Sequence, residues 1–130
     1  MMGKYWRLLA EYDAEATTYG ACAGGGGSSP YTPDKDGRLI GLRTMVGDDA
    51  ATSLVNHGNF KLTCSTFTPN VIEVGFQGTG LRTVPAFMQM PIDWAIDQPV
   101  KAGVPITIEA RHLTADTPIT ASVLIFGLFE

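Results

Sequence analysis

The chain has 130 residues, of which 45% are hydrophobic and 17% are charged, and its formal net charge is −4. This length predicts a single domain, residues 1–130, that can bury a core without disulfide staples. The basic residues are scattered singly, whereas phosphate-binding surfaces cluster Lys and Arg, so the composition gives no strong nucleic-acid signal. The low charged fraction leaves neutral surface for contact with other copies of the chain, which hints at assembly.

The N-terminal segment MMGKYWRLLAEYDAEATTYG is not expected to be a secretion signal, because Arg7 and Glu11 interrupt its apolar residues. No stretch approaches the roughly 18 consecutive apolar residues that a membrane-spanning helix needs. We therefore expect synthesis in the cytoplasm and no membrane span. Two cysteines, Cys22 and Cys64, do not make a disulfide framework, and free thiols are favoured over a single bridge.

The first third of the chain predicts two strands joined by a long loop. Residues 4–12, KYWRLLAEY, have the alternation of a strand, with a short amphipathic helix as the alternative. The strand would place Trp6, Leu8, Ala10 and Tyr12 on one face, and Arg7 and Glu11 on the other. Residues 20–37 are rich in Gly and Pro and predict the loop. Residues 38–46, RLIGLRTMV, predict a strand whose alternation is imperfect.

Residues 47–58, GDDAATSLVNHG, are the best candidate for a helix. Asp48 or Asp49 would cap its start, and Gly58 would close its end. Leu54 and Val55 would dock the helix on a sheet. Helix signals are poor elsewhere, so we expect at most one short helix.

The middle of the chain contains the clearest strand, residues 59–67, in which apolar and polar residues alternate strictly. Cys64 would face inward in the row Phe60, Leu62, Cys64 and Thr66, and Phe67 would face the other way. Residues 71–78, VIEVGFQG, predict the next strand after a turn. Residues 83–90, TVPAFMQM, follow, and residues 91–99, PIDWAIDQP, are expected to be irregular.

The last two segments, VPITIEARHL and ITASVLIFGLF, predict a hairpin joined by the polar run TADTP. In the first segment, one face would carry Ile106, Ile108, Ala110 and His112. The second is apolar on both faces. One face carries Val123, Ile125, Gly127 and Phe129, and the other carries Leu124, Phe126 and Leu128. A half-buried strand normally has polar residues on one side. The second face must therefore be covered by a helix or loop of the same chain, or by a neighbouring subunit.

Seven or eight short strands with long, irregular connections predict an all-β protein, built as an antiparallel β-sandwich. A jelly roll is the topology that we favour for this sandwich.

Motifs for cofactors, metals and catalysis fail on their spacing. The glycine run at 24–30 lacks the Gly-Lys-Ser/Thr ending of a phosphate loop, and DKDG at 34–37 lacks the closing Glu of a calcium loop. His57 and His112 lie far apart without paired ligands, which disfavours a zinc site. No nucleophile elbow or catalytic-cysteine signature is present. We predict no catalytic residue, no metal and no cofactor, and we expect that the protein is not an enzyme.

Phe87, Met88, Met90 and Trp94 form an apolar cluster among prolines. Three interpretations are open: core filling beneath a loop, since Met adapts to irregular gaps; a patch at an interface; or a sugar-binding platform that uses Trp94 or Tyr31.

The segment QPVKAGVPITIEARHLTADTPITASVLIFGLFE, residues 98–130, resembles the end of many single-jelly-roll viral structural proteins. In those proteins a polar entry with Ala-Gly leads to an alternating strand, a short polar turn and a hydrophobic final strand. The resemblance implies a self-assembling coat or virion subunit, found in a virion or other assembled particle. Its partners would be further copies of itself and other virion proteins.

For contacts between subunits we select six apolar residues, namely Phe87, Met88, Met90, Phe126, Leu128 and Phe129. The main alternative is a ligand- or carbohydrate-binding β-sandwich. An enzyme of the cupin type is disfavoured, because closely spaced His and Glu ligands are lacking.

Overall fold

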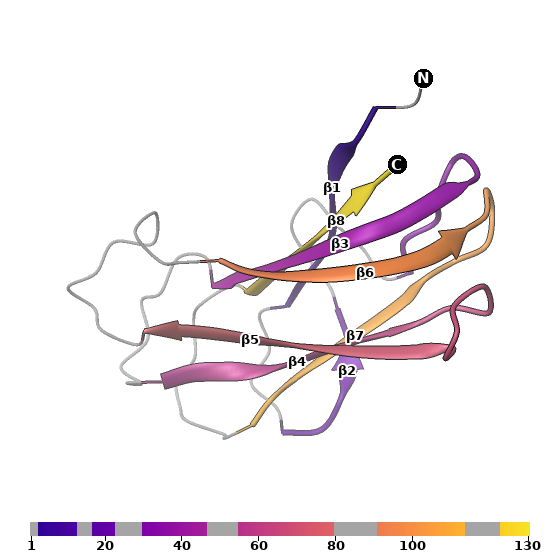
Figure 1. Ribbon diagram of the computed structural model, residues 1–130. Coiled ribbons are helices and arrows are strands. Elements are labelled where there is room, and N and C mark those ends of the chain that lie inside the picture. Colours follow the sequence, from indigo (N-terminus) through magenta and orange to yellow (C-terminus); the bar gives the residue numbers. More distant parts are fainter. Residues whose placement is uncertain (1–2, 13–16, 23–29, 47–54, 80–90, 114–122) are drawn as a thin grey trace.

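The computed structural model describes residues 3–12, 17–22, 30–46, 55–79, 91–113 and 123–130 (Figure 1). These residues contain eight strands and no helix, which confirms the prediction of an all-β protein. The strands are β1 (Tyr5–Tyr12), β2 (Gly20–Ala21), β3 (Gly37–Val46), β4 (Val55–Thr63), β5 (Val71–Thr79), β6 (Ile92–Val100), β7 (Thr107–His112) and β8 (Val123–Phe129).

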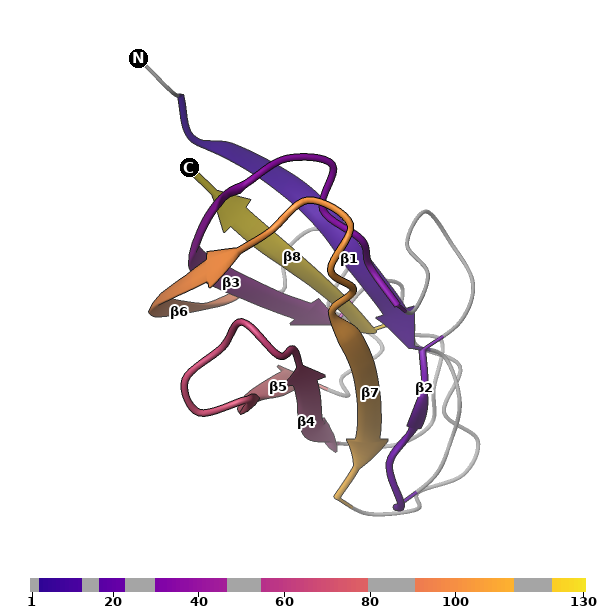
Figure 2. The ribbon, with the colours of Figure 1, turned by 90° about the vertical axis from the view of Figure 1, so that its right-hand side faces the viewer.

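The strands form two antiparallel sheets that pack face to face as a sandwich (Figure 2). Sheet A has the order β1-β8-β3-β6, and sheet B has the order β2-β7-β4-β5. The pairing is nested: the first strand pairs with the last, the second with the seventh, the third with the sixth and the fourth with the fifth. Two further pairs, β3 with β8 and β4 with β7, join these nested pairs into the two sheets.

The core lies between the sheets and is filled by alternate residues of both. Leu42 and Ile125 of sheet A and Phe60 and Ile108 of sheet B are fully buried. A hydrogen bond also ties the layers together, because the buried Thr44 hydroxyl of β3 donates to the carbonyl oxygen of Gly75 in β5 at 2.8 Å. A buried donor with a partner avoids the free-energy cost of an unsatisfied group.

Strand β1 departs from the predicted alternation at a bulge. Its pairing with β8 shifts between Leu8 and Ala10. The irregularity shifts the alternation, so even-numbered residues before it and after it face opposite sides. Trp6 is 38% exposed and Leu8 is half-buried, whereas Ala10 and Tyr12 are buried. The prediction that these four residues share one face is therefore wrong.

The predicted helix at 47–58 is wrong at its C-terminal end, because residues 55–58 begin strand β4. Residues 47–54 lie outside the described part of the chain. Gly58 does not close a helix; it pairs with Phe76 on one side and His112 on the other. A Cβ atom at Gly58 would lie 2.0 Å from the carbonyl oxygen of Arg111 and 2.6 Å from the Phe76 ring. This close approach of a neighbouring backbone explains why glycine occupies the strand.

The predicted strand at 59–67 ends early, at Thr63, so Thr66 of its predicted inward row lies in the turn beyond it. Phe60, Leu62 and Cys64 are buried, but so is Phe67, which the alternation places outside. Beyond Thr63 the chain turns, and the Phe67 amide donates to the carbonyl oxygen of Cys64 at 3.2 Å. The turn directs the Phe67 ring back into the core.

Both cysteines are free and buried, as the sequence favours. Burial, with a smaller contribution from the charge of Glu109, raises the pKa of the Cys22 thiol to about 12. The thiolate form of Cys22 is therefore negligible at neutral pH.

Three further expectations are corrected. Residues 92–100 form strand β6, whose pairing with β3 shifts at one point, between Leu39 and Gly41, and whose Pro99 is tolerated because β6 lies at a sheet edge. The predicted loop 20–37 contains the short strand β2 and a bridge between Tyr31 and Ile106. The C-terminal hairpin does not exist, since β7 belongs to sheet B and β8 to sheet A. The inward row predicted for the first of these two segments is nevertheless confirmed, because all four of its residues are buried: Ile106, Ile108, Ala110 and His112.

Substituting Gly58→Ala tests the close packing at the centre of sheet B. The added methyl group collides with the backbone of β7, so we expect the free energy of unfolding in urea to fall by about 1–3 kcal/mol. Gly20→Ala is the matched control, because nothing lies within 4 Å of a Cβ atom at that position. Equal stability of the two variants would contradict the packing.

Candidate interaction surface

Strand β8 presents one row of side chains to the core and an apolar row to the outside. Leu124, Phe126 and Leu128 alternate along it with the buried row and are half-buried. Their partial burial comes from β1 and β3, which flank β8 on either side. Of the strands that the structure describes, none lies over this row (Figure 2).

The neighbouring strands extend this apolar row into a wider surface. In register, Trp6 and Leu8 of β1 lie beside Leu128 and Phe126, and Met45 of β3 lies beside Leu124. We call this surface the apolar outer face; it consists of Trp6, Leu8, Met45, Leu124, Phe126 and Leu128. Contiguous apolar surface of this kind on a small protein commonly marks a contact with a partner.

A shallow hollow of about 280 Å³ lies in the outer surface of sheet A. Trp6, Arg43, Met45 and Phe126 line it, so it spans β1, β8 and β3. Its walls are mainly apolar side chains, and Arg43 supplies the charge. The hollow is smaller than the roughly 300–1,000 Å³ of typical small-molecule sites.

Arg43 holds the Trp6 ring in place. Its guanidinium carbon lies 4.6 Å from the centre of the indole ring. The same guanidinium donates two hydrogen bonds to the Asp93 carboxylate of β6, at 2.6 and 2.8 Å. These hydrogen bonds lower the pKa of the Asp93 carboxyl and raise the pKa of Arg43. A Trp beside a bidentate Arg is the pair of residue types most enriched at binding hot spots.

A second ion pair, between Arg38 of β3 and Asp97 of β6, lies along the same two strands. The outer surface of sheet A is thus apolar over β1 and β8 and carries paired charges over β3 and β6.

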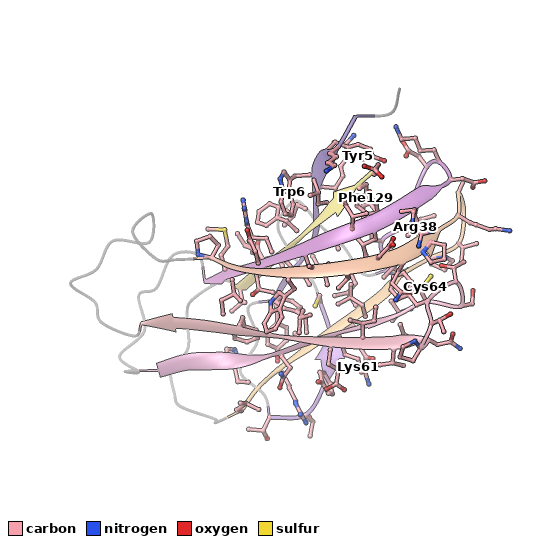
Figure 3. The ribbon with its side chains drawn as sticks, viewed as in Figure 1. Tyr5, Trp6, Arg38, Lys61, Cys64 and Phe129 are labelled. Carbon is pink, nitrogen blue, oxygen red and sulfur yellow. The ribbon has the colours of Figure 1, made fainter. Side chains whose placement is uncertain are left out.

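The outer surface of sheet B is different, because charged side chains form a ladder across it. Lys61 of β4 lies in register with Glu73 of β5 and Glu109 of β7, and its Nζ is 3.4 Å from the Glu109 carboxylate. Lys61 and Arg111 each lie 4.5 Å from the centre of the Tyr19 ring. Figure 3 shows Trp6 and Lys61 on opposite sides of the sandwich. Sheet B therefore has the polar outer surface that an antiparallel sheet exposes to water.

The six residues selected from the sequence for subunit contacts have different positions in the structure. Phe126 and Leu128 lie on the apolar outer face. Phe129 does not: it is 3% exposed and stacks between Tyr5 and Tyr31, with ring centres 5.7 and 5.8 Å apart, so it belongs to the core. Phe87, Met88 and Met90 lie outside the described residues.

The two aromatic residues considered for sugar binding belong to different places. The Tyr31 ring packs on Phe129, while Trp94 of β6 is 36% exposed and lies near Gly75 of β5. Sequence reasoning missed Trp6, Arg43 and Met45 as surface residues. The sequence does contain the oppositely charged Arg43 and Asp93, but they can be recognised as a pair only when the pairing of β3 with β6 is known.

Comparison with known proteins finds no family model that matches this chain and no curated protein that is similar to it. In the described residues, no three His, Cys, Asp or Glu side chains are placed to share a metal ion. No helix in that part of the chain is long and apolar enough to cross a bilayer. The apolar outer face of sheet A is of the chemical character that packs against another apolar surface.

The pair between Arg43 and Asp93 predicts a small pH-dependent contribution to stability. Because the pKa of Asp93 is lower in the folded protein than in the unfolded chain, the stabilisation is present above the ordinary carboxyl pKa and is lost as the pH falls through the lowered value. The pair is solvent-exposed, so its contribution is below about 1 kcal/mol.

We expect the wild-type protein to lose slightly more stability than Asp93→Asn when the pH is lowered from 5 to 3 in urea titrations, pH values chosen to bracket the roughly 3.9 of a free aspartate. Asp34→Asn, an exposed carboxyl outside the pair, is the control. Parallel pH profiles for wild type and Asp93→Asn would contradict the role given to the pair.

Proposed function

We propose that this chain is a non-enzymatic structural subunit that assembles with copies of itself, most simply as a coat or virion protein. One observation carries the proposal: the two outer surfaces of the sandwich differ in kind. Sheet A presents the apolar outer face, and sheet B presents a ladder of paired charges. The subunit would function within an assembled particle rather than as an isolated domain.

The physical basis is the free energy of removing apolar surface from water. Each square ångström of apolar area that is covered contributes about 25 cal/mol. Trp6 and the outer row of β8 remain available to a partner because their own sheet covers them only at the sides. Many copies that cover one another's apolar outer faces remove this surface together, and symmetry repeats each contact throughout the assembly.

Two further features support the proposal. The nested pairing of four strand pairs over two four-stranded sheets is the arrangement expected of a jelly roll, a fold common among viral capsid domains. The C-terminal segment 98–130 resembles the end of single-jelly-roll viral structural proteins in sequence. Both features fit a shell-forming subunit.

The test measures the mass of the purified chain by size-exclusion chromatography with light scattering, from micromolar to millimolar concentration, with electron microscopy of the largest species. We expect species well above the 13.9 kDa of one chain. Trp6→Ser removes a hot-spot side chain and should raise the concentration needed for assembly by about thirtyfold or more.

Val71→Ser is the matched control, because Val71 is also an exposed apolar residue but lies in sheet B, opposite Thr63. It should leave assembly unchanged. A folded chain that stays monomeric at millimolar concentration would overturn the proposed function.

A further inference from the structure

The outer surface of sheet A is divided along its strands. The half over β1 and β8 carries Trp6, Leu8, Leu124, Phe126 and Leu128. The half over β3 and β6 carries the ion pairs Arg43–Asp93 and Arg38–Asp97. A partner that covers the whole surface has to desolvate both ion pairs, whereas a partner over β1 and β8 removes mainly apolar surface from water.

Charge on this surface is balanced within one chain. Both arginines are paired with aspartates of the same chain. On β1, Glu11 lies beside Leu124 of the outer row, whereas Arg7 is in register with Gly127 of the inner row. The paired charges of one copy therefore add no specific repulsion to the approach of a second copy, and they offer little to a strongly charged partner. The occupant that this charge distribution fits is a second copy of the chain.

We propose that two copies stack symmetrically through the β1–β8 halves of their sheets, about a two-fold axis near Leu8 and Phe126. These residues are direct partners in the register and lie in the middle of the apolar half. The arrangement places apolar surface against apolar surface and leaves the ion pairs of each copy at the wet rim. Two sheets stacked in this way pack about 10 Å apart. The inference rests on the proposed function and identifies which surfaces of the two copies meet.

The size of the contact predicts its strength. The two strands β1 and β8, spaced about 4.8 Å apart, with about 3.3 Å per residue along the seven residues of β8, make a half-face of roughly 10 by 23 Å. Two copies that stack through these halves therefore bury on the order of 500 Å², well below the roughly 1,600 Å² of a standard stable interface. The pair should form reversibly at high concentration, and other contacts are needed to complete a particle.

The test uses opposite charges at one position, Leu8→Lys and Leu8→Glu, in the full chain, with sedimentation equilibrium as the measurement and circular dichroism as the check of folding. In a symmetric contact near the axis, Leu8 of one copy faces Leu8 of the other. Each variant alone should associate about a hundredfold more weakly than the wild type, because like charges meet. An equimolar mixture should recover much of the association, because Lys then faces Glu. The same pair of substitutions at Phe126, the register partner of Leu8 at the axis, repeats the test if the Leu8 variants do not fold.

The outcomes separate this inference from the proposed function. If both variants are weakened and their mixture does not recover, the surface meets a different part of the partner, and the symmetric stacking is overturned while assembly stands. If neither variant is weakened and the chain still assembles, the contact lies elsewhere and the inference fails alone. If the wild-type chain is monomeric at every concentration, the proposed function fails as well.

Discussion

Strand β8 occupies the centre of sheet A with apolar side chains on both of its faces, and this constraint shapes the whole molecule. On the inner face, Val123 and Ile125 are fully buried against sheet B. Gly127 belongs to the same row because a Cβ atom there would come within 2.9 Å of Leu39 and 3.1 Å of Leu9. On the outer face, the flanking strands cover the row only at its sides. The core is thus filled within one chain, whereas no described strand covers the outer row of β8.

The nested pairing of strands turns this local property into a surface. Because the first strand pairs with the last, the N-terminal strand contributes Trp6 and Leu8 beside the outer row of β8. The bulge in β1 makes this possible, since it lets Trp6 and Leu8 face outward while Ala10 and Tyr12 stay in the core. Strand β3 on the other side adds Met45 and the arginine that holds Trp6. The apolar outer face is therefore built from three strands that are remote in sequence.

Sequence patterns predicted those features that depend on neighbouring residues. Alternation is local, so it identified the buried row from Ile106 to His112 and the two apolar rows of β8. It failed where pairing decides the outcome: the final strand pairs with β1 and β3 rather than with its neighbour in sequence. A glycine such as Gly58 is typical both of a helix end and of a place where two backbones approach closely, so the sequence alone does not distinguish the two. Arg43 and Asp93 are 50 residues apart, and only the register of β3 with β6 brings them together.

The most direct test of the account is carbene footprinting by mass spectrometry of the protein in its assembled and dissociated states. The account predicts that Trp6, Leu8, Phe126 and Leu128 lose labelling on assembly, while Lys61 and Glu109 on sheet B keep theirs. Protection of sheet B with an unchanged apolar outer face, or equal labelling of both sheets in the two states, would contradict it.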